Sequence, residues 1–158
     1  MKRFILLCAL LLSFAARAGL EEGTEAYSTG DYAKALVEFR ALADQGNSDG
    51  QYFLGFMYHN GFGVKRDQAE ALKWFQKAAH QGDARAQYYV GIMYAAGQGV
   101  QKDLQMADMW LTLSASNPKS SYRDSLYTKE EIGKIERKMT PEQIAQAKES
   151  VKNWKPQN

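Results

Sequence analysis

The chain has 158 residues, with 20 basic and 18 acidic side chains and a formal net charge of +2 at pH 7. A chain of this length fits one domain. Its nearly balanced charge gives no electrostatic basis for binding nucleic acid or an anionic membrane, and its single cysteine excludes an intramolecular disulfide. Stability therefore has to come from the burial of apolar side chains.

The first 18 residues predict a secretory signal peptide. Lys2 and Arg3 form a basic start, residues 4–14 are almost wholly apolar, and residues 16–18 are a small-x-small cleavage site. The apolar run is shorter than the roughly 20 residues that cross a bilayer, so no stable membrane span is expected. Cleavage near Ala18 would make the protein periplasmic or secreted.

Removal of the signal peptide would change the charge and the cysteine content. It would take away three basic residues and no acidic one, so that 17 basic side chains would face 18 acidic ones and the net charge would be −1. Cys8 would leave with the same segment. We therefore expect a mature protein without disulfides and without a nucleic acid partner.

A repeat with a period of 36 residues organises the chain. Residues 51–82 return when 36 is added to each position, and the second half of this stretch also returns when 36 is subtracted. A period in this range is typical of stacked supersecondary units. The structural repeat positions are Gly55, Tyr58, Gly61, Gly63 and Trp74 in one unit and Gly91, Tyr94, Gly97, Gly99 and Trp110 in the next.

Apolar residues at helical spacing predict a pair of helices in each unit. The first pair is expected at 20–28 and 31–43, separated by a break at Gly30. The second pair starts with a helix at 49–60, and Asp67 with Glu70 predicts an acidic variant of the capping box at its second helix. The third pair is expected within 86–116.

Gly55 and Gly91 lie in the middle of predicted helices, where glycine costs about 1 kcal/mol relative to alanine. Their recurrence at one repeat position predicts that another helix packs against the bare backbone. Trp74 and Trp110 also share one repeat position, which favours packing between units over ligand stacking.

The period stops at residues 117–118, and two further helices are expected after it. Thr128 with Glu131 predicts a capping box for a helix that carries Ile132, Ile135 and Met139 on one face. Residues 140–143 predict the start of a last helix with a threonine cap and proline at its first position. One apolar and one charged face on this helix suit a terminal cap, whereas residues 120–127 receive no role.

Residues 86–100, AQYYVGIMYAAGQGV, followed by Asp103, Ala107 and Trp110, closely resemble the Sel-one-like repeat (SLR). The preceding unit resembles the same repeat, with Gly50 in place of the opening alanine. The unit before it resembles a plain tetratricopeptide repeat, and residues 139–145 resemble the tail of small bacterial proteins of this family.

This resemblance implies an all-α fold, an α/α solenoid of stacked antiparallel helix pairs. The expected organisation is a signal peptide (1–18), a tetratricopeptide-like repeat (19–48), two Sel-one-like repeats (49–85 and 86–119) and carboxy-terminal capping helices (120–158). The family implies a non-enzymatic adaptor without cofactor that binds a protein or peptide, and we expect a monomer. Family membership names no partner.

Superposition of the units on the tetratricopeptide pattern predicts a concave groove. The positions that face it are Tyr52, Phe56, His59 and Asn60, then Arg85, Tyr88, Ile92 and Ala95. The corresponding positions of the first unit are Glu21, Glu25 and Ser28, which predicts an acidic amino-terminal end. An alternative left open is that this stripe packs on the carboxy-terminal helices, because exposed apolar patches need a reason.

Catalytic and metal-binding motifs are weak or missing. Ser116 and Lys119 have the S-x-x-K spacing of serine acyl-enzymes, but this segment follows a helix end and contains a proline. His59 and His80 are the only histidines and predict no protein-only metal site. Three functions remain: a peptide-binding adaptor, an inhibitor or immunity-type binder of one secreted enzyme, and, least favoured, a secreted hydrolase.

Overall fold

The computed structural model describes the backbone of residues 2–157 and the side chains of residues 16–157 apart from residue 122. All regular structure in this part of the chain is helical. The helices are α1 (Lys2–Thr29), α2 (Tyr32–Asp44), α3 (Ser48–Asn60), α4 (Gln68–His80), α5 (Ala84–Ala96), α6 (Leu104–Ser116), α7 (Tyr122–Glu136) and α8 (Pro141–Asn153). The predicted all-α fold is confirmed.

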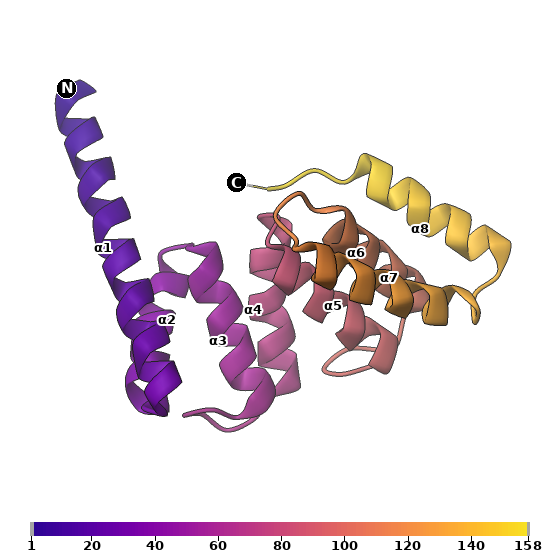
Figure 1. Ribbon diagram of the computed structural model, residues 1–158, viewed down its shortest axis with the longest axis horizontal. Helices are drawn as coiled ribbons and strands as arrows, with labels where there is room; N and C mark the ends of the chain where they lie inside the picture. Colours follow the sequence, from indigo (N-terminus) through magenta and orange to yellow (C-terminus); the bar gives the residue numbers. More distant parts are fainter. Residues whose placement is uncertain (1, 158) are drawn as a thin grey trace.

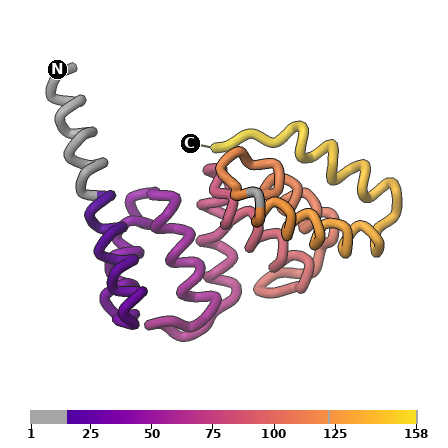
Figure 2. The backbone as a smooth tube through the Cα atoms, viewed as in Figure 1, coloured from indigo at the N-terminus to yellow at the C-terminus, as the bar shows by residue number. Residues whose placement is uncertain are grey.

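The first six helices form three stacked pairs (Figure 1). Within the pairs α1 packs on α2, α3 on α4 and α5 on α6, and successive pairs meet through α2 with α3 and α4 with α5. The backbone trace shows successive helices running in alternating directions across the stack, with α8 returning toward its middle (Figure 2). The chain is therefore an α solenoid of repeated helix pairs.

Short polar side chains start most of these helices. Each of Asp31, Asn47, Asp67, Asp83 and Asp103 accepts a hydrogen bond from a backbone N–H in the first turn. The prediction of a reciprocal bond between the Asp67 N–H and the Glu70 side chain is wrong. The Glu70 carboxylate instead accepts a bond of 2.8 Å from Trp74 Nε1. The backbone N–H of Asp67 instead donates to the Tyr58 carbonyl at 3.0 Å.

A glycine in each odd-numbered helix of the three pairs lets a bulky side chain of the next helix approach. A Cβ on Gly55 would lie 2.8 Å from Phe75 Cδ1, and one on Gly91 would lie 2.6 Å from Leu111 Cγ and 3.1 Å from the Ala107 carbonyl oxygen. The predicted close contact is present, although side chains fill most of it. The sequence reasoning missed Gly23 of α1, which faces Phe39 in the same way at 2.6 Å.

The second glycine of each G-x-G-V turn touches the preceding helix pair. Gly63 has φ +67°, and a Cβ added to it would lie only 2.5 Å from the Tyr32 carbonyl oxygen. Gly99 contacts the Gln68 carbonyl at the equivalent place, and Tyr32 and Gln68 are the first residues of α2 and α4. Each turn therefore lies on the start of a helix in the unit before it, which explains why a side chain is excluded.

Polar side chains also join the units at the repeat period. The buried Gln51 and Gln87 donate to the carbonyls of Ala43 and Ala79, at 3.5 and 3.3 Å. Gln81 Nε2 in turn donates to Gln51 Oε1 at 2.8 Å. These bonds connect each unit to its neighbour through groups that would otherwise be buried without partners.

The tyrosines and tryptophans that recur after 36 residues pack between helices. Tyr58 and Tyr94 are half-buried, and their hydroxyls accept bonds from Arg40 at 2.6 Å and Gln76 at 3.2 Å. Trp74 and Trp110 have only 6% and 2% of their surface exposed, in two core clusters. The two tryptophans are therefore not available to a partner.

The carboxy-terminal region corrects one prediction and confirms another. Thr128 does not cap a helix: α7 starts earlier, after the cap Ser121, and the Thr128 hydroxyl donates to the Asp124 carbonyl within it. The predicted Thr140 capping box is present. Helix α8 packs on α6, and beyond it the Gln157 N–H donates to the His80 carbonyl at 2.8 Å.

A candidate protein-interaction groove

Four aromatic side chains from α1, α3 and α5 form a continuous half-buried surface, which we call the aromatic surface: Tyr27, Tyr52, Phe56 and Tyr89. Phe56 lies at its centre, with ring centroids 6.2 Å from Tyr27, 6.2 Å from Tyr52 and 5.8 Å from Tyr89. Aromatic rings in such offset and edge arrangements support one another and present large apolar area.

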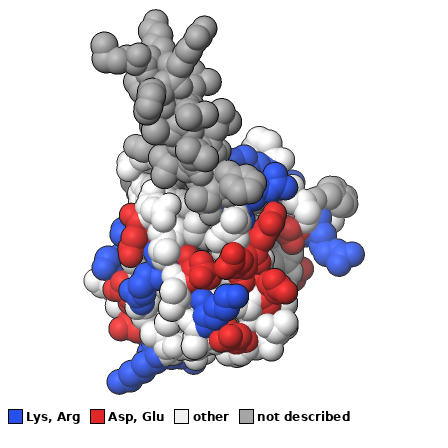
Figure 3. Space-filling model, turned by 90° about the vertical axis from the view of Figure 1, so that its left-hand side faces the viewer, with Lys and Arg blue, Asp and Glu red and all other residues white. Residues whose placement is uncertain are grey.

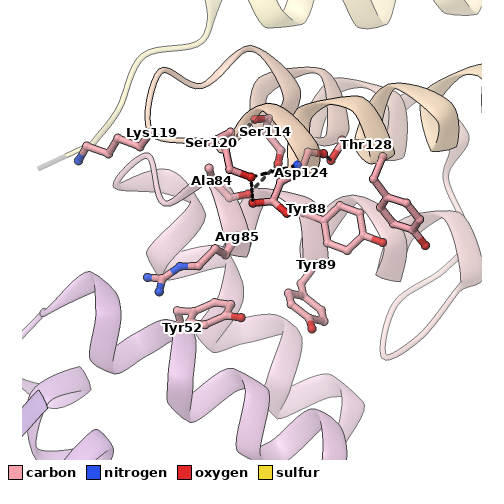
Figure 4. Close-up of a pocket in the computed structure, with 12 residues that line it drawn as sticks. Tyr52, Ala84, Arg85, Tyr88, Tyr89, Ser114, Lys119, Ser120, Asp124 and Thr128 are labelled. Carbon is pink, nitrogen blue, oxygen red and sulfur yellow. Dashed lines mark hydrogen bonds between the residues drawn. The ribbon is translucent and has the colours of Figure 1, made fainter. Parts of the chain in front are cut away.

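One end of the aromatic surface opens into a cavity of about 380 Å³, which we call the tyrosine cavity (Figure 4). Its walls come from α3, α5, α7 and the loop between α6 and α7. The lining side chains that matter below are Tyr52, Arg85, Tyr88, Tyr89, Lys119, Asp124 and Tyr127. Three predicted groove residues, Tyr52, Arg85 and Tyr88, are therefore brought to one place.

Arg85 is held firmly at the edge of this cavity. Its guanidinium carbon lies 4.2 Å from the centre of the Tyr52 ring, and its nitrogens donate to Asp49 and Asp83. Burial opposes the charge on Arg85, but the hydrogen bonds and charges of Asp83 and Asp49 outweigh it and raise the Arg85 pKa. Arg85 thus joins the start of α3 to the start of α5.

The cavity tyrosines stay neutral at physiological pH. Burial raises the pKa of Tyr52, and burial together with the neighbouring Tyr127 raises the pKa of Tyr88. A neutral phenol keeps its O–H and can donate a hydrogen bond to a ligand.

His59 and Asn60 have different surroundings. The His59 ring lies 5.6 Å from Tyr89 and 6.3 Å from Phe75, and burial lowers its pKa. A neutral His59 therefore extends the aromatic surface. Asn60 is exposed at the end of α3, and its amide donates to the Phe56 carbonyl at 2.9 Å.

The second copy of the predicted stripe is covered by α7. This agrees with the alternative that the stripe packs on the carboxy-terminal helices. Tyr88, Ile92 and Ala95 pack with Ile132 and Ile135 of α7, and with Met139 just beyond it, over the buried Leu111. The first copy is not covered in this way, because α8 packs on α6 and leaves Tyr52 and Phe56 open. Ile92 is therefore part of the core beside α7 and not of an accessible groove.

The predicted acidic end of the groove is not a continuous patch. Glu21 and Glu25 are exposed, and Arg17, which pairs with Glu21 at 3.3 Å, lies within the predicted signal peptide. Figure 3 shows acidic and basic side chains next to one another on this end of the molecule. We therefore assign no charge preference to it.

Four site residues were missed from the sequence, among them Tyr27 of α1, whose unit was assigned Glu21, Glu25 and Ser28 instead. Tyr89 occupies the repeat position of Phe53, 36 residues earlier, which the groove assignment left out. Tyr127 lies in the segment without an assigned role, and Lys119 was considered only as part of the S-x-x-K pattern. The Tyr88-Tyr89 pair was the signal that could have identified the site.

The catalytic alternative gains no support from Ser116. Its hydroxyl donates to the Thr112 carbonyl at 2.7 Å, at the last residue of α6. Among the residues that the structure describes, no cluster of three or more histidine, cysteine or acidic residues could bind a metal. Within the same residues, none of the helices combines the length and the apolar character needed to cross a membrane.

The stacked helix pairs define a helical-repeat protein. A family model described as the Sel1 repeat matches residues 48–83 and 84–118. The chain therefore contains two Sel1 repeats. Proteins of this family generally mediate protein–protein interactions and are typically non-catalytic.

Solved structures with the same fold come from bacteria. One is a protective antigen present in uropathogenic Escherichia coli strains displaying an SLR fold, with 30% identity and a TM-score of 0.81 over 88% of this chain and 29% of that one. Another is a Sel1 repeat protein from Oxalobacter formigenes, with 29% identity and a TM-score of 0.60 over 67% of this chain and 43% of that one. The chain thus spans less than half of either protein, and no curated protein matches it.

Proposed function

We propose that this protein is a non-enzymatic interaction module of the bacterial cell envelope that holds a helix or peptide segment of one partner protein in its groove. The observation that carries the proposal is the aromatic surface around Phe56, which α7 and α8 leave open. Aromatic side chains at the centre of an interface commonly supply most of its binding energy. A helix or peptide laid in a groove buries such anchors efficiently.

The cell-envelope setting rests on the signal peptide predicted at residues 1–18. Most of those side chains lie outside the described residues, and α1 continues through the predicted cleavage site near Ala18. Cleavage there would retain Gly23 and Ala26, which pack on α2 and the neighbouring core. The mature first pair therefore keeps these contacts and loses only that of Ala16 among the described core contacts, and we propose a periplasmic or secreted monomer.

The groove is tested with the double variant Tyr52→Ala, Phe56→Ala. Removal of both rings is expected to weaken capture of the native partner from a bacterial envelope extract by about tenfold or more. Crosslinking pulldown with quantitative mass spectrometry measures the effect. Val37→Ala is the matched control, because Val37 is an apolar side chain of α2 with 64% of its surface exposed.

Partner recovery must fall in the double variant and stay constant in the control. Circular dichroism and thermal unfolding check that both variants remain folded. A folded double variant that captures the same partner as efficiently as the wild type would contradict the proposed groove. Recovery of one secreted enzyme whose activity is blocked would identify an inhibitor.

A further inference from the structure

The first turns of α3, α5 and α7 carry charged residues at the same position relative to the N-cap. Asp49, Arg85 and Arg123 each lie two residues after the N-cap, in α3, α5 and α7. In the first step, from α3 to α5, Arg85 pairs with Asp49 across the units. In the second step, from α5 to α7, both positions are basic, so the equivalent ion pair cannot form.

Helix α7 packs on α6, but one tyrosine contact between α5 and α7 repeats a contact between α3 and α5. The rings of Tyr52 and Tyr89 are 6.0 Å apart at 51°, and those of Tyr88 and Tyr127 are 6.0 Å apart at 49°. Tyr89 and Tyr127 both lie six residues after the N-cap of their helix. The two steps can therefore be compared position by position, and the second one lacks a carboxylate.

The groups around the second step favour an anion. Asp83, which also holds Arg85, is replaced at the start of α7 by the neutral Ser121. Lys119 is exposed, and within the described part of the chain neither it nor Arg123 is in an ion pair. Within the cavity lining Arg85 is already paired with Asp49 and Asp83, so Lys119 supplies the remaining positive charge. The one carboxylate of the lining, Asp124, accepts a bond from the Ser121 hydroxyl at 2.6 Å.

The cavity places these cations beside apolar surface. In Figure 4, Arg85 and Lys119 extend toward one side, whereas the Tyr88 and Tyr89 rings lie on the other. The phenol groups of the cavity can donate to an acceptor, since they stay protonated. A ligand that fits has a carboxylate next to an aromatic or aliphatic side chain.

We propose that the tyrosine cavity with Lys119 and Arg123 binds an acidic segment of the partner protein, in which a glutamate or aspartate precedes or follows an apolar residue. The partner's carboxylate supplies the charge that Asp49 supplies in the preceding step, and the apolar residue enters among the tyrosines. This inference rests on the proposed function and adds the chemistry of the bound segment.

The probes are three capped pentapeptides with glycine at each end and a central phenylalanine, flanked by two glutamates, two glutamines or two lysines. The full-length chain is titrated with each peptide, and binding is followed by the side-chain NMR signals of its tyrosines. The glutamate peptide is expected to bind about fivefold or more tightly than the glutamine peptide, because two exposed ion pairs each add a small factor. The lysine peptide should bind weakest.

The double variant Lys119→Gln, Arg123→Gln should remove the preference for glutamate while leaving binding of the glutamine peptide unchanged. Lys129→Gln, on an exposed position of α7 outside the cavity lining, is the control and should retain the preference. Equal binding of the three peptides, or tightest binding of the lysine peptide, would overturn the inference. Such a result would leave the proposed function standing if the Tyr52→Ala, Phe56→Ala variant still lost its partner.

Discussion

Gly91→Ala is expected to lower the melting temperature of the protein by roughly 2–8 °C. The added Cβ would lie 2.6 Å from Leu111 Cγ, which is a branched atom close to its own helix, and 3.1 Å from the Ala107 carbonyl oxygen. The gain in helix propensity of about 1 kcal/mol is smaller than an overpacking cost of 1–3 kcal/mol. Gly55→Ala should act in the same direction against Phe75.

The matched control is the same substitution at Gly133 of α7. A Cβ at Gly133 would meet only the flexible end of Arg137, at 3.8 Å, so Gly133→Ala should raise the melting temperature by about 2–4 °C. Lys77→Ala is a poorer control, because the Lys77 ammonium lies 3.8 Å from the Trp74 ring. Differential scanning calorimetry measures all variants. A Gly91→Ala protein that melts higher than the wild type would show that this helix contact can relax.

The second large effect concerns Asp108, a buried carboxylate of α6. Only 1% of its surface is exposed, and neither carboxylate oxygen has a hydrogen-bond partner within the described residues. Burial and, next, the charge of Glu136 on α7 raise its pKa from 3.8 to about 6, and Lys148 on α8 opposes this only in part. Glu136 and Lys148 are themselves paired at 3.1 Å.

Because the folded-state pKa of Asp108 lies above its unfolded value, this group destabilises the protein when it is ionised. The contribution of Asp108 to the free energy of unfolding should therefore be most favourable below about pH 4 and should decline as the pH rises toward about 6. A pKa difference of this size changes the free energy of unfolding by at most about 3 kcal/mol. Asp108→Asn should raise the free energy of unfolding by about 2 kcal/mol at pH 7.5 and by little at pH 4.

Urea unfolding of wild type and variant at several pH values measures this difference. Asp44→Asn, at the exposed end of α2, is the control and should leave the wild-type pH dependence in place. If the difference between Asp108→Asn and wild type is the same at pH 4 and pH 7.5, ionisation of Asp108 has no part in stability.

The repeat period was enough to predict the fold, because it reports contacts that recur in every unit. The same contact explains both copies of each recurring feature: the helix glycines Gly55 and Gly91, the G-x-G-V turns and the two tryptophans. The region after residue 117 lacks this redundancy, and there the prediction failed. Thr128 with Glu131 has the spacing of a capping box, but a serine seven residues earlier starts the helix with its own bond to Asp124.

The candidate site was predicted only in part for the same reason. Tyr52, Phe56 and His59 could be placed from the repeat alone, since their surroundings come from neighbouring units. Whether Tyr88 and Ile92 stay open depends on where α7 packs, and nothing in the period determines that position. The cavity itself needs Lys119 and Tyr127 from outside the repeats, so its charge could not be derived before the structure.

The return of the chain beyond α8 has a consequence for how this solenoid unfolds. Repeat arrays often lose their terminal units one at a time, because each unit contacts only its neighbours. Here Trp154 packs near Trp110, with ring centroids 6.3 Å apart, and Gln157 bonds to His80 at the end of the second pair. Loss of the last segment therefore removes contacts from two units at once. Hydrogen exchange should show α4 and α6 opening together with α8, as one cooperative block, while α1 exchanges independently at the other end.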